Sequence, residues 1–152
     1  MKKIALALSL IMLTVLSSCK KDDSQTPKTK SDILVASTWQ IDEVIVTGGT
    51  VYPVGQLYKK GIAGQNDFSK VRLTFRADGT ATAIDNSGNS STSGKWALTN
   101  GDTKLVISDT GNFLLDGNGD IVLIDTGTFN FKGSRSLSGK SVDATVKMIP
   151  AQ

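Results

Sequence analysis

Hydrophobic and polar residues alternate strictly over residues 70–76, which is the clearest pattern in the chain. Three apolar side chains fall on one side of this segment when it is extended, and four polar side chains fall on the other. A period of two is typical of a β-strand with one buried face. The turn sequence Ala77-Asp78-Gly79 follows, so we predict that residues 80–84 return beside the first segment as a hairpin.

Short segments of similar character recur along the chain, separated by turn signals such as Asn100-Gly101-Asp102. Residues 50–69 are rich in glycine and proline breakers and are predicted to form a long loop or a short helix over one end of the fold. A glycine-rich turn is predicted over residues 116–120, and a polar loop over residues 87–93. Further strands are predicted at residues 39–47, 95–99, 104–108, 113–115, 121–124, 128–132 and 142–149.

These segments predict an all-β fold. Beyond the N-terminal region, no segment of ten or more residues has an apolar stripe of helical period. Eight or nine short antiparallel strands with closely spaced turns indicate an up-and-down barrel of about eight strands, with a β-sandwich as the alternative.

The N-terminus has a different pattern. Lys2 and Lys3 precede an apolar run of thirteen residues, 4–16. A bilayer-spanning helix needs about 20 residues, so this run fits the hydrophobic region of a signal peptide instead. The run ends in Leu16-Ser17-Ser18-Cys19, which resembles the bacterial lipobox, in which the cysteine thiol takes up diacylglycerol. We therefore predict a cleaved lipoprotein signal peptide over residues 1–18 and lipid attachment at Cys19.

Cys19 is the single cysteine, so intramolecular disulfides and metal clusters built on several thiolates are excluded. Two or more acyl chains on one residue anchor a protein stably, and we expect an outer-membrane lipoprotein. Residues 20–23 resemble the surface-export tags of Bacteroidota lipoproteins, with a solvated start to a linker as the alternative. Residues 19–31 are predicted to form the lipidated cysteine and a flexible linker, and residues 32–152 the β domain.

Charge adds little to this picture. The chain has 17 Lys and Arg against 14 Asp and Glu. Removal of Lys2 and Lys3 with the signal peptide leaves a formal charge of +1, because all the acidic residues follow Cys19. No basic patch stands out, so we expect no nucleic-acid partner. We expect a monomer whose partners are the membrane, through the lipid, and a small ligand.

Three sequence motifs carry a family resemblance. They are Ser37-Thr38-Trp39 at the first strand, the "F-x-x-D-G-T" pattern at residues 75–80, and the "G-x-W-x-L" pattern at residues 94–98. In this order, over roughly residues 34–125, they resemble the lipocalin-like lipoproteins of the Bacteroidota. The resemblance implies a β-barrel of about eight strands that binds small apolar molecules. Ser37 departs from the glycine usual there, and no second cysteine is available for a lipocalin disulfide.

Aromatic residues are the candidate ligand-binding residues that follow from this resemblance. If each strand keeps its register, Phe131 and four of the candidates face the barrel interior, and the two tyrosines lie near its opening. Ala81 and Ala83 either leave space for a ligand or accommodate the tryptophans in a full core. The candidate ligand-binding residues are Trp39, Tyr52, Tyr58, Phe75, Trp96 and Phe129.

Catalytic chemistry finds little support. Histidine is absent, which removes Ser-His pairs and imidazole metal ligands. Two Asp-Thr-Gly tripeptides, at 109–111 and 125–127, match the aspartic-protease sequence, but a hairpin turn prefers the same residues. Glu43, the single glutamate, is predicted to be turned outward by a β-bulge, since strict alternation would bury it.

Metal binding finds little support either. Asp116, Asn118 and Asp120 are spaced like calcium ligands, but the later glycine and glutamate of an EF-hand loop are missing, so a plain turn is expected. We therefore expect no enzyme activity, no catalytic residues, no metal and no cofactor.

Two functions remain open from the sequence. The first is a membrane-anchored binding protein whose barrel holds a small apolar ligand. The alternative is a non-enzymatic structural or interaction protein of the cell envelope, with a filled core. The packing of the barrel interior is the observation that would separate them.

Overall fold

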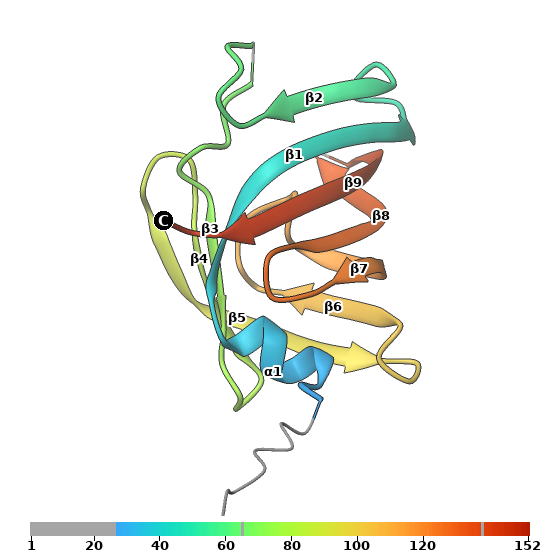
Figure 1. The fold of residues 1–152 in the computed structure, drawn as a ribbon. Coiled ribbons are helices and arrows are strands. Elements are labelled where there is room, and N and C mark those ends of the chain that lie inside the picture. Colours follow the sequence, from blue (N-terminus) through green and yellow to red (C-terminus); the bar gives the residue numbers. More distant parts are fainter. Residues whose placement is uncertain (1–26, 65, 138) are drawn as a thin grey trace, which may run out of the picture.

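A computed structural model describes residues 27–64, 66–137 and 139–152. One short helix, α1 (Lys30–Val35), precedes nine strands in the described residues (Figure 1). The strands are β1 (Thr38–Gly49), β2 (Gly55–Lys59), β3 (Arg72–Phe75), β4 (Thr80–Ile84), β5 (Ser90–Thr99), β6 (Lys104–Ser108), β7 (Gly117–Ile124), β8 (Phe129–Leu137) and β9 (Lys140–Pro150).

Eight of these strands form a closed antiparallel barrel. Strands β3 to β9 pair in sequence order, and β1 closes the ring by pairing with both β3 and β9. β2 lies outside the ring and pairs with residues 43–46 of β1 (Figure 1). The predicted all-β barrel of about eight strands is therefore confirmed, and the sandwich alternative is wrong.

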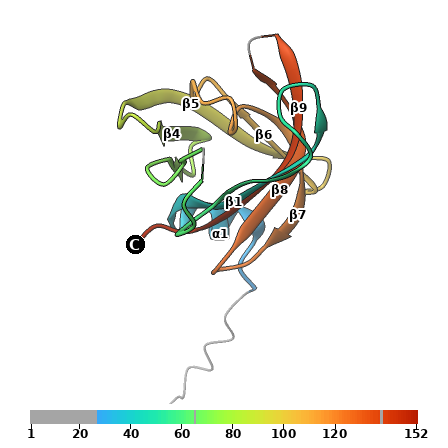
Figure 2. The same ribbon diagram turned by 90° about the horizontal axis from the view of Figure 1, so that it is seen from above.

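A short helix covers one end of the barrel (Figures 1 and 2). Thr29 and Asp32 cap it reciprocally: Asp32 N donates to Thr29 Oγ1 (3.1 Å), and Thr29 N donates to Asp32 Oδ2 (2.9 Å). Leu34 is fully buried, and Trp39 Nε1 donates to its carbonyl oxygen (2.9 Å). The sequence pattern did not predict this helix, because six residues are too few to show a helical stripe.

The helix begins within the segment predicted to be a flexible linker. The predicted signal peptide, Cys19 and residues 20–23 lie outside the described residues. Among the residues that the structure does describe, none forms a helix with the length and apolar character needed to cross a membrane.

Residues 50–69 differ from the prediction because they contain a strand, β2. Its alternation covers only a few residues between glycine and proline breakers, which is too short to stand out in the sequence. Pairing with β1 orders it, and Tyr58 packs edge-on against Phe68, with ring centroids 5.5 Å apart.

The region after β6 was predicted wrongly in two places. Residues 113–115 form a turn rather than a strand. Leu114 and Leu115 are both fully buried, whereas neighbouring residues of one strand point to opposite faces of the sheet. The predicted turn at 116–120 is mostly strand β7. Its glycines are needed because β7 and β8 approach closely: a Cβ added at Gly119 would lie 3.1 Å from Lys132 O.

Other strand boundaries are close to the prediction. Residues 80–84 and 104–108 form strands as predicted. β5 starts at Ser90, inside the predicted polar loop, and β8 and β9 extend five and two residues further toward their shared hairpin than expected. Most residues of these extensions are polar or glycine, so no apolar alternation marked them.

The bulge predicted at Glu43 is confirmed. The register of β1 against β9 shifts between Ile41 and Glu43, so that Val44 and Val46, rather than Ile45, face the core. Glu43 instead pairs with Lys147 (Oε2 to Nζ, 2.5 Å) and accepts a hydrogen bond from Gln56 Nε2 (2.6 Å). The hydrogen bond from Lys147 lowers the pKa of the Glu43 carboxyl group.

Candidate ligand-binding site

Four of the predicted ligand-binding residues meet inside the barrel. Trp39, Phe75, Trp96 and Phe129 are all buried. Ring centroids lie 5.6 Å apart for Trp39 and Phe129, 6.0 Å for Phe75 and Phe129, and 5.0 Å for Phe75 and Trp96. These separations are typical of aromatic pairs in contact. The cluster comes from β1, β3, β5 and β8, as the inward register of each strand predicted.

Side chains occupy this part of the interior. Phe131 stacks on Phe129 with 5.0 Å between centroids, and Ala81 and Ala83 are buried on the neighbouring strand β4. Trp96 Nε1 donates to Arg76 O (2.8 Å). The small alanines therefore lie in a packed aromatic interior, which is the second of the two arrangements considered from the sequence.

Tyr52 and Tyr58 lie elsewhere. They line a second pocket, of about 470 Å³, between β2 and the segment that follows it, together with Leu57 and Ile62. Tyr58 is buried, and no described residue accepts a hydrogen bond from its hydroxyl group. Burial, and then the nearby charge of Asp67, raise the pKa of Tyr58. Among the described ring pairs, Tyr58 contacts Phe68 and none of the four clustered aromatic residues.

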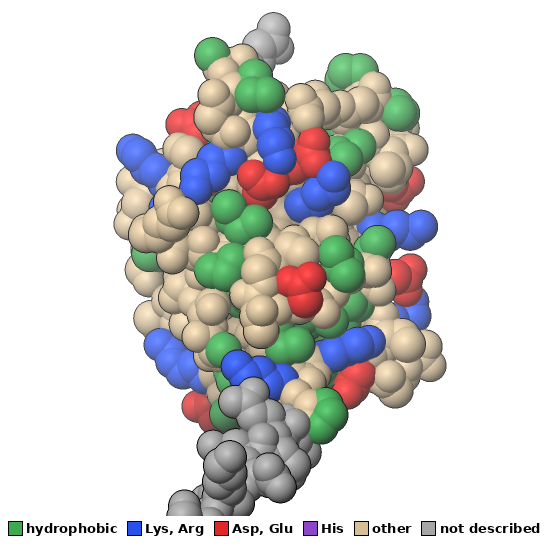
Figure 3. All heavy atoms as spheres, viewed as in Figure 1, with side chains coloured by type: hydrophobic (Ala, Val, Ile, Leu, Met, Phe, Trp, Pro, Cys, Tyr) green, Lys and Arg blue, Asp and Glu red, His purple; other side chains and the backbone are tan. Residues whose placement is uncertain are grey.

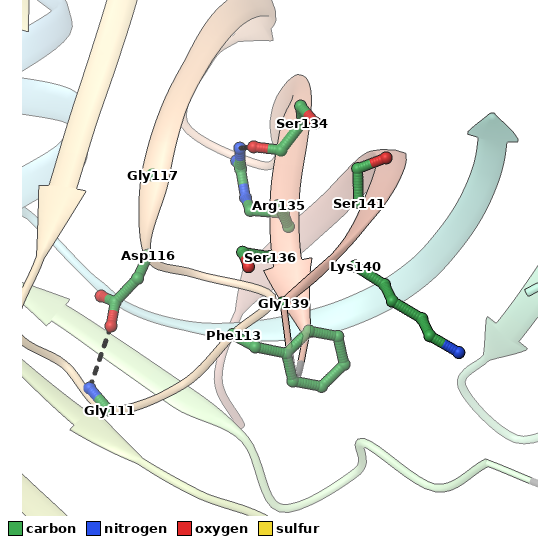
Figure 4. Close-up of a pocket in the computed structure, with 10 residues that line it drawn as sticks. All are labelled: Gly111, Phe113, Asp116, Gly117, Ser134, Arg135, Ser136, Gly139, Lys140 and Ser141. Atoms are coloured by element: carbon green, nitrogen blue, oxygen red, sulfur yellow. Dashed lines mark hydrogen bonds between the residues drawn. The ribbon is translucent and has the colours of Figure 1, made fainter. Parts of the chain in front are cut away.

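A larger pocket opens at the end of the barrel opposite α1, and we call it the open-end pocket. It measures about 700 Å³ and is open to solvent. Figure 4 shows the residues that line it. The loop between β6 and β7, residues 109–116, forms one wall, and the β8–β9 hairpin forms the other. Its lining residues are Gly111, Phe113, Asp116, Gly117, Ser134, Arg135, Ser136, Gly139, Lys140 and Ser141.

The 109–116 loop is held by one carboxylate. Asp116 accepts hydrogen bonds from Thr110 N (3.1 Å), Thr110 Oγ1 (2.6 Å) and Gly111 N (3.0 Å). Leu114 and Leu115, which belong to the loop, are fully buried. Positive φ angles at Asp109 (60°) and Gly111 (72°) let the chain double back over the barrel. The wall of the pocket is thus built by local hydrogen bonds and apolar burial.

The three residues that are spaced like calcium ligands, Asp116, Asn118 and Asp120, make separate contacts. Asp116 caps its own loop, whereas Asp120 pairs with Lys104 (2.6 Å) and Asn118 offers its backbone oxygen to Arg135. Across the described ranges, no group of three or more acidic, histidine or cysteine side chains is placed to hold a metal ion. At the second Asp-Thr-Gly, Asp125 Oδ1 accepts from the amides of Gly127 (2.7 Å) and Thr128 (2.8 Å), as in the expected turn.

Arg135 is the buried one of the three charged residues that line the open-end pocket, and the other two are Asp116 and Lys140. Only 3% of the surface of Arg135 is exposed. Its Nε donates to Leu114 O (3.2 Å), and its Nη1 donates to Asn118 O (2.8 Å) and Ser134 O (3.1 Å). The guanidinium lies over the Phe131 ring, 5.1 Å from the centroid. Burial lowers the pKa of Arg135 below its usual value.

Sequence reasoning missed Arg135 because the strand was predicted to end at residue 132. A signal was present, since Phe129, Phe131, Gly133 and Arg135 follow a period of two. Continued alternation would have placed the arginine on the inward face. An inward arginine in a barrel strand is the kind of exception that marks a site.

On the face of the molecule seen in Figure 3, Lys and Arg side chains are interspersed with Asp and Glu, so no patch of one sign of charge is visible there. Two of the described ion pairs, Lys59 with Asp42 (2.6 Å) and Lys104 with Asp120 (2.6 Å), join neighbouring strands. Arg135 differs from these charged residues because it is buried and forms no ion pair with another described residue.

Comparison with known proteins gives one family. Residues 35–146 match the family model described as a lipocalin-like domain. This range runs from the end of α1 to most of β9, so it takes in the barrel and both walls of the open-end pocket. No curated protein matches the chain.

Proposed function

We infer the function of this chain from its family: it belongs to the lipocalin-like domain family, and residues 35–146 carry the match. A closed eight-stranded barrel of this kind is compatible with binding one small ligand. We propose that the domain binds a small, largely apolar molecule in the open-end pocket and catalyses no reaction on it.

One observation carries this proposal, namely the open-end pocket itself. Its volume of about 700 Å³ lies within the range of roughly 300–1,000 Å³ typical of small-molecule sites. Its lining combines one aromatic side chain, Phe113, with several polar side chains, among them the buried Arg135. Polar groups fix the orientation of a ligand in sites of this kind. The aromatic cluster forms the packed interior beneath this pocket, so the ligand site is proposed above the cluster rather than within it.

Binding is tested with the chain from Cys19 onward, which retains every residue that the structure describes, and with Cys19→Ala to leave it without lipid. The probe is N-phenyl-1-naphthylamine, a neutral dye whose fluorescence rises in apolar surroundings. Ser136→Trp places a bulky ring in the pocket and should weaken dye binding about tenfold or more. The matched control Ser90→Trp changes an exposed serine of β5 outside the pocket lining and should bind like the wild type.

Equal dye binding by the wild type and Ser136→Trp would place the ligand elsewhere and overturn the proposal. No dye binding at all would favour a second candidate, a non-enzymatic interaction protein of the cell envelope with a filled core. A specific observation supports this second candidate: Val54 and Ile62, on either side of β2, are 73% and 62% exposed.

We also propose that Cys19 anchors the protein to the outer membrane through lipid, on the basis of the lipobox-like sequence. Cells supplied with labelled fatty acid should label the wild type, and Cys19→Ala should abolish the label. Equal labelling of the two would contradict the anchor. Protease added to intact cells then distinguishes a surface-exposed domain, which is removed, from one that faces the periplasm.

A further inference from the structure

Two neighbouring aliphatic residues of β7, Val122 and Leu123, are exposed, and we call them the apolar pair. Their exposed fractions are 57% and 45%. Regular alternation along a strand would turn one of two consecutive side chains inward. The register of β7 against β8 shifts between Ile121 and Leu123, so a β-bulge lies at this point. The bulge accounts for the exposure of both side chains on the outside of the barrel.

The apolar pair lies at the end of the barrel that α1 covers. Lys30, the first residue of α1, donates from Nζ to Asp102 O (2.6 Å) in the turn between β5 and β6. Ile121 N donates to Thr103 O (2.8 Å) in the same turn. This turn therefore lies between the start of α1 and the residue that precedes the apolar pair. Strand β2 lies on the opposite side of the molecule from α1 (Figure 1).

A lipid on Cys19 would bring this end of the barrel near a membrane. Pro27, the first described residue, lies eight residues after Cys19. A chain of eight residues spans at most about 29 Å, even when it is fully extended. The start of α1, and with it the apolar pair, would thus stay close to the bilayer surface. Because tethering raises the effective concentration of the two surfaces, a weak contact is enough to orient the domain.

The surroundings of the apolar pair favour a lipid surface as its partner. Two carboxylates lie near it in the chain, and both already have partners: Asp120 pairs with Lys104 (2.6 Å), and Asp125 accepts from the amides of Gly127 and Thr128. Two side chains are a much smaller surface than the roughly 800 Å² that a specific protein partner usually covers. A lipid surface requires no such area of matching shape.

We propose that the apolar pair docks the barrel onto the lipid surface in which Cys19 is anchored, with Val122 and Leu123 inserted between the lipid head groups. This inference rests on the proposed lipid anchor and adds the orientation of the domain on the membrane. Docking through the end covered by α1 leaves the open-end pocket facing away from the bilayer, where a ligand can enter from solution.

The test uses the fact that Cys19 is the single cysteine. The chain from Cys19 onward is coupled to a maleimide-bearing phospholipid in phosphatidylcholine vesicles that contain brominated lipid as a fluorescence quencher. The emission of Val122→Trp should be quenched about twofold or more, since interfacial apolar groups lie roughly 5–10 Å into the bilayer boundary. Val54→Trp, a matched exposed valine directly before β2, should be quenched no more than the wild type. Trp39 and Trp96 are buried and give the wild-type baseline.

A second substitution separates docking by the apolar pair from an effect of the added ring. Leu123→Asp in the Val122→Trp background should return the quenching to the wild-type level, because a charged group opposes entry into an apolar environment. Ile62→Asp is the matched control, since it replaces an exposed aliphatic residue beyond β2, and it should leave the quenching unchanged.

Quenching of Val122→Trp no greater than that of the wild type would overturn the docking inference, as would equal quenching of Val54→Trp. Quenching that survives Leu123→Asp would also overturn it. All three results leave the lipid anchor standing, because chemical coupling replaces the natural lipid in these vesicles. The anchor is tested separately by fatty-acid labelling in cells, where absence of the label would overturn the anchor itself.

Discussion

The two ends of the barrel are closed in different ways. At one end, α1 covers the barrel, Leu34 and Trp39 are fully buried, and the indole N–H of Trp39 donates to Leu34 O (2.9 Å). At the other end, the 109–116 loop and the β8–β9 hairpin leave a pocket of about 700 Å³. Arg135 lies there and is buried, and no described residue accepts a hydrogen bond from its Nη2.

This difference indicates that the end covered by α1 contributes mainly to stability and that the open end is the place to expect ligand binding. Every polar atom of the Leu34–Trp39 contact is paired, so the end covered by α1 adds apolar burial at little electrostatic cost. The open end retains a buried charge, which opposes folding, beside a pocket that is open to solvent. Departures of this kind from local consistency are expected at functional sites. We therefore expect substitutions at the two ends to differ in size and in kind.

The largest effect is expected at Trp39. Trp39→Ala should lower the free energy of unfolding by about 3–5 kcal/mol, because it empties a fully buried site in contact with Phe129. Phe113→Ala at the open end should cost less than half as much, since Phe113 is half-buried beside the pocket. Denaturant unfolding measures both variants. Equal losses at the two ends would contradict the contrast.

The next effect concerns the interior between the two ends. Ala83→Leu adds bulk to a fully buried position of β4 and should destabilise the fold by about 1–3 kcal/mol. Ala97→Leu, on the exposed face of β5, is the matched control and should change stability by less than about 0.5 kcal/mol. If Ala83→Leu costs nothing and instead abolishes ligand binding, the interior holds a cavity and the ligand site extends below the open end.

A smaller, pH-dependent effect is expected at Glu43, where β1, β2 and β9 meet. The hydrogen bond from Lys147 lowers the pKa of Glu43 from its ordinary value of 4.5. The ionised carboxylate therefore stabilises the fold fully above that value, and this contribution is lost as the pH falls through the lowered pKa. Glu43→Gln should cost about 1 kcal/mol at neutral pH and progressively less in acid. Thermal melts across pH 2 to 7 measure the difference, and a constant difference would exclude the ion pair as its source.

The smallest change in stability is expected for Arg135→Met. Removal of the buried charge offsets the loss of three hydrogen bonds to carbonyl oxygens, so stability should stay within about 1 kcal/mol of the wild type. Lys132→Met on the same strand controls for the loss of charge. A loss comparable to that of Trp39→Ala would show that Arg135 holds the open end together, and the contrast between the two ends would then disappear.

Much of the barrel could be predicted from alternation and turn residues alone. Residues 70–76 alternate because one face is buried, and Asn100-Gly101-Asp102 takes positive φ angles of 54°, 62° and 60° in its hairpin. Helix α1 and strand β2 could not be predicted, because each is short and becomes ordered through contacts with β1 and the barrel end. The inward aromatic residues were predicted correctly, since their strands keep a regular register.

The candidate site was predicted only in part. Trp39, Phe75, Trp96 and Phe129 were expected inside and lie there, but they pack against one another instead of lining the open-end pocket. The pocket depends on where the 109–116 loop folds and how far the β8–β9 hairpin extends. Neither feature has an extended apolar period: the loop has only the short run at residues 113–115, and the hairpin is mostly polar residues and glycines.

The sequence by itself determined the all-β class, the inward faces of the long strands and the bulge at Glu43, because burial of one face imposes a period of two on the residues. The tertiary structure alone decided that the interior is packed with aromatic rings, that α1 covers one end, and that Arg135 is buried at the other without a carboxylate. Those features depend on which strands become neighbours when β1 pairs with β9 and closes the barrel. Such pairing joins residues far apart in the chain, and no local pattern records it.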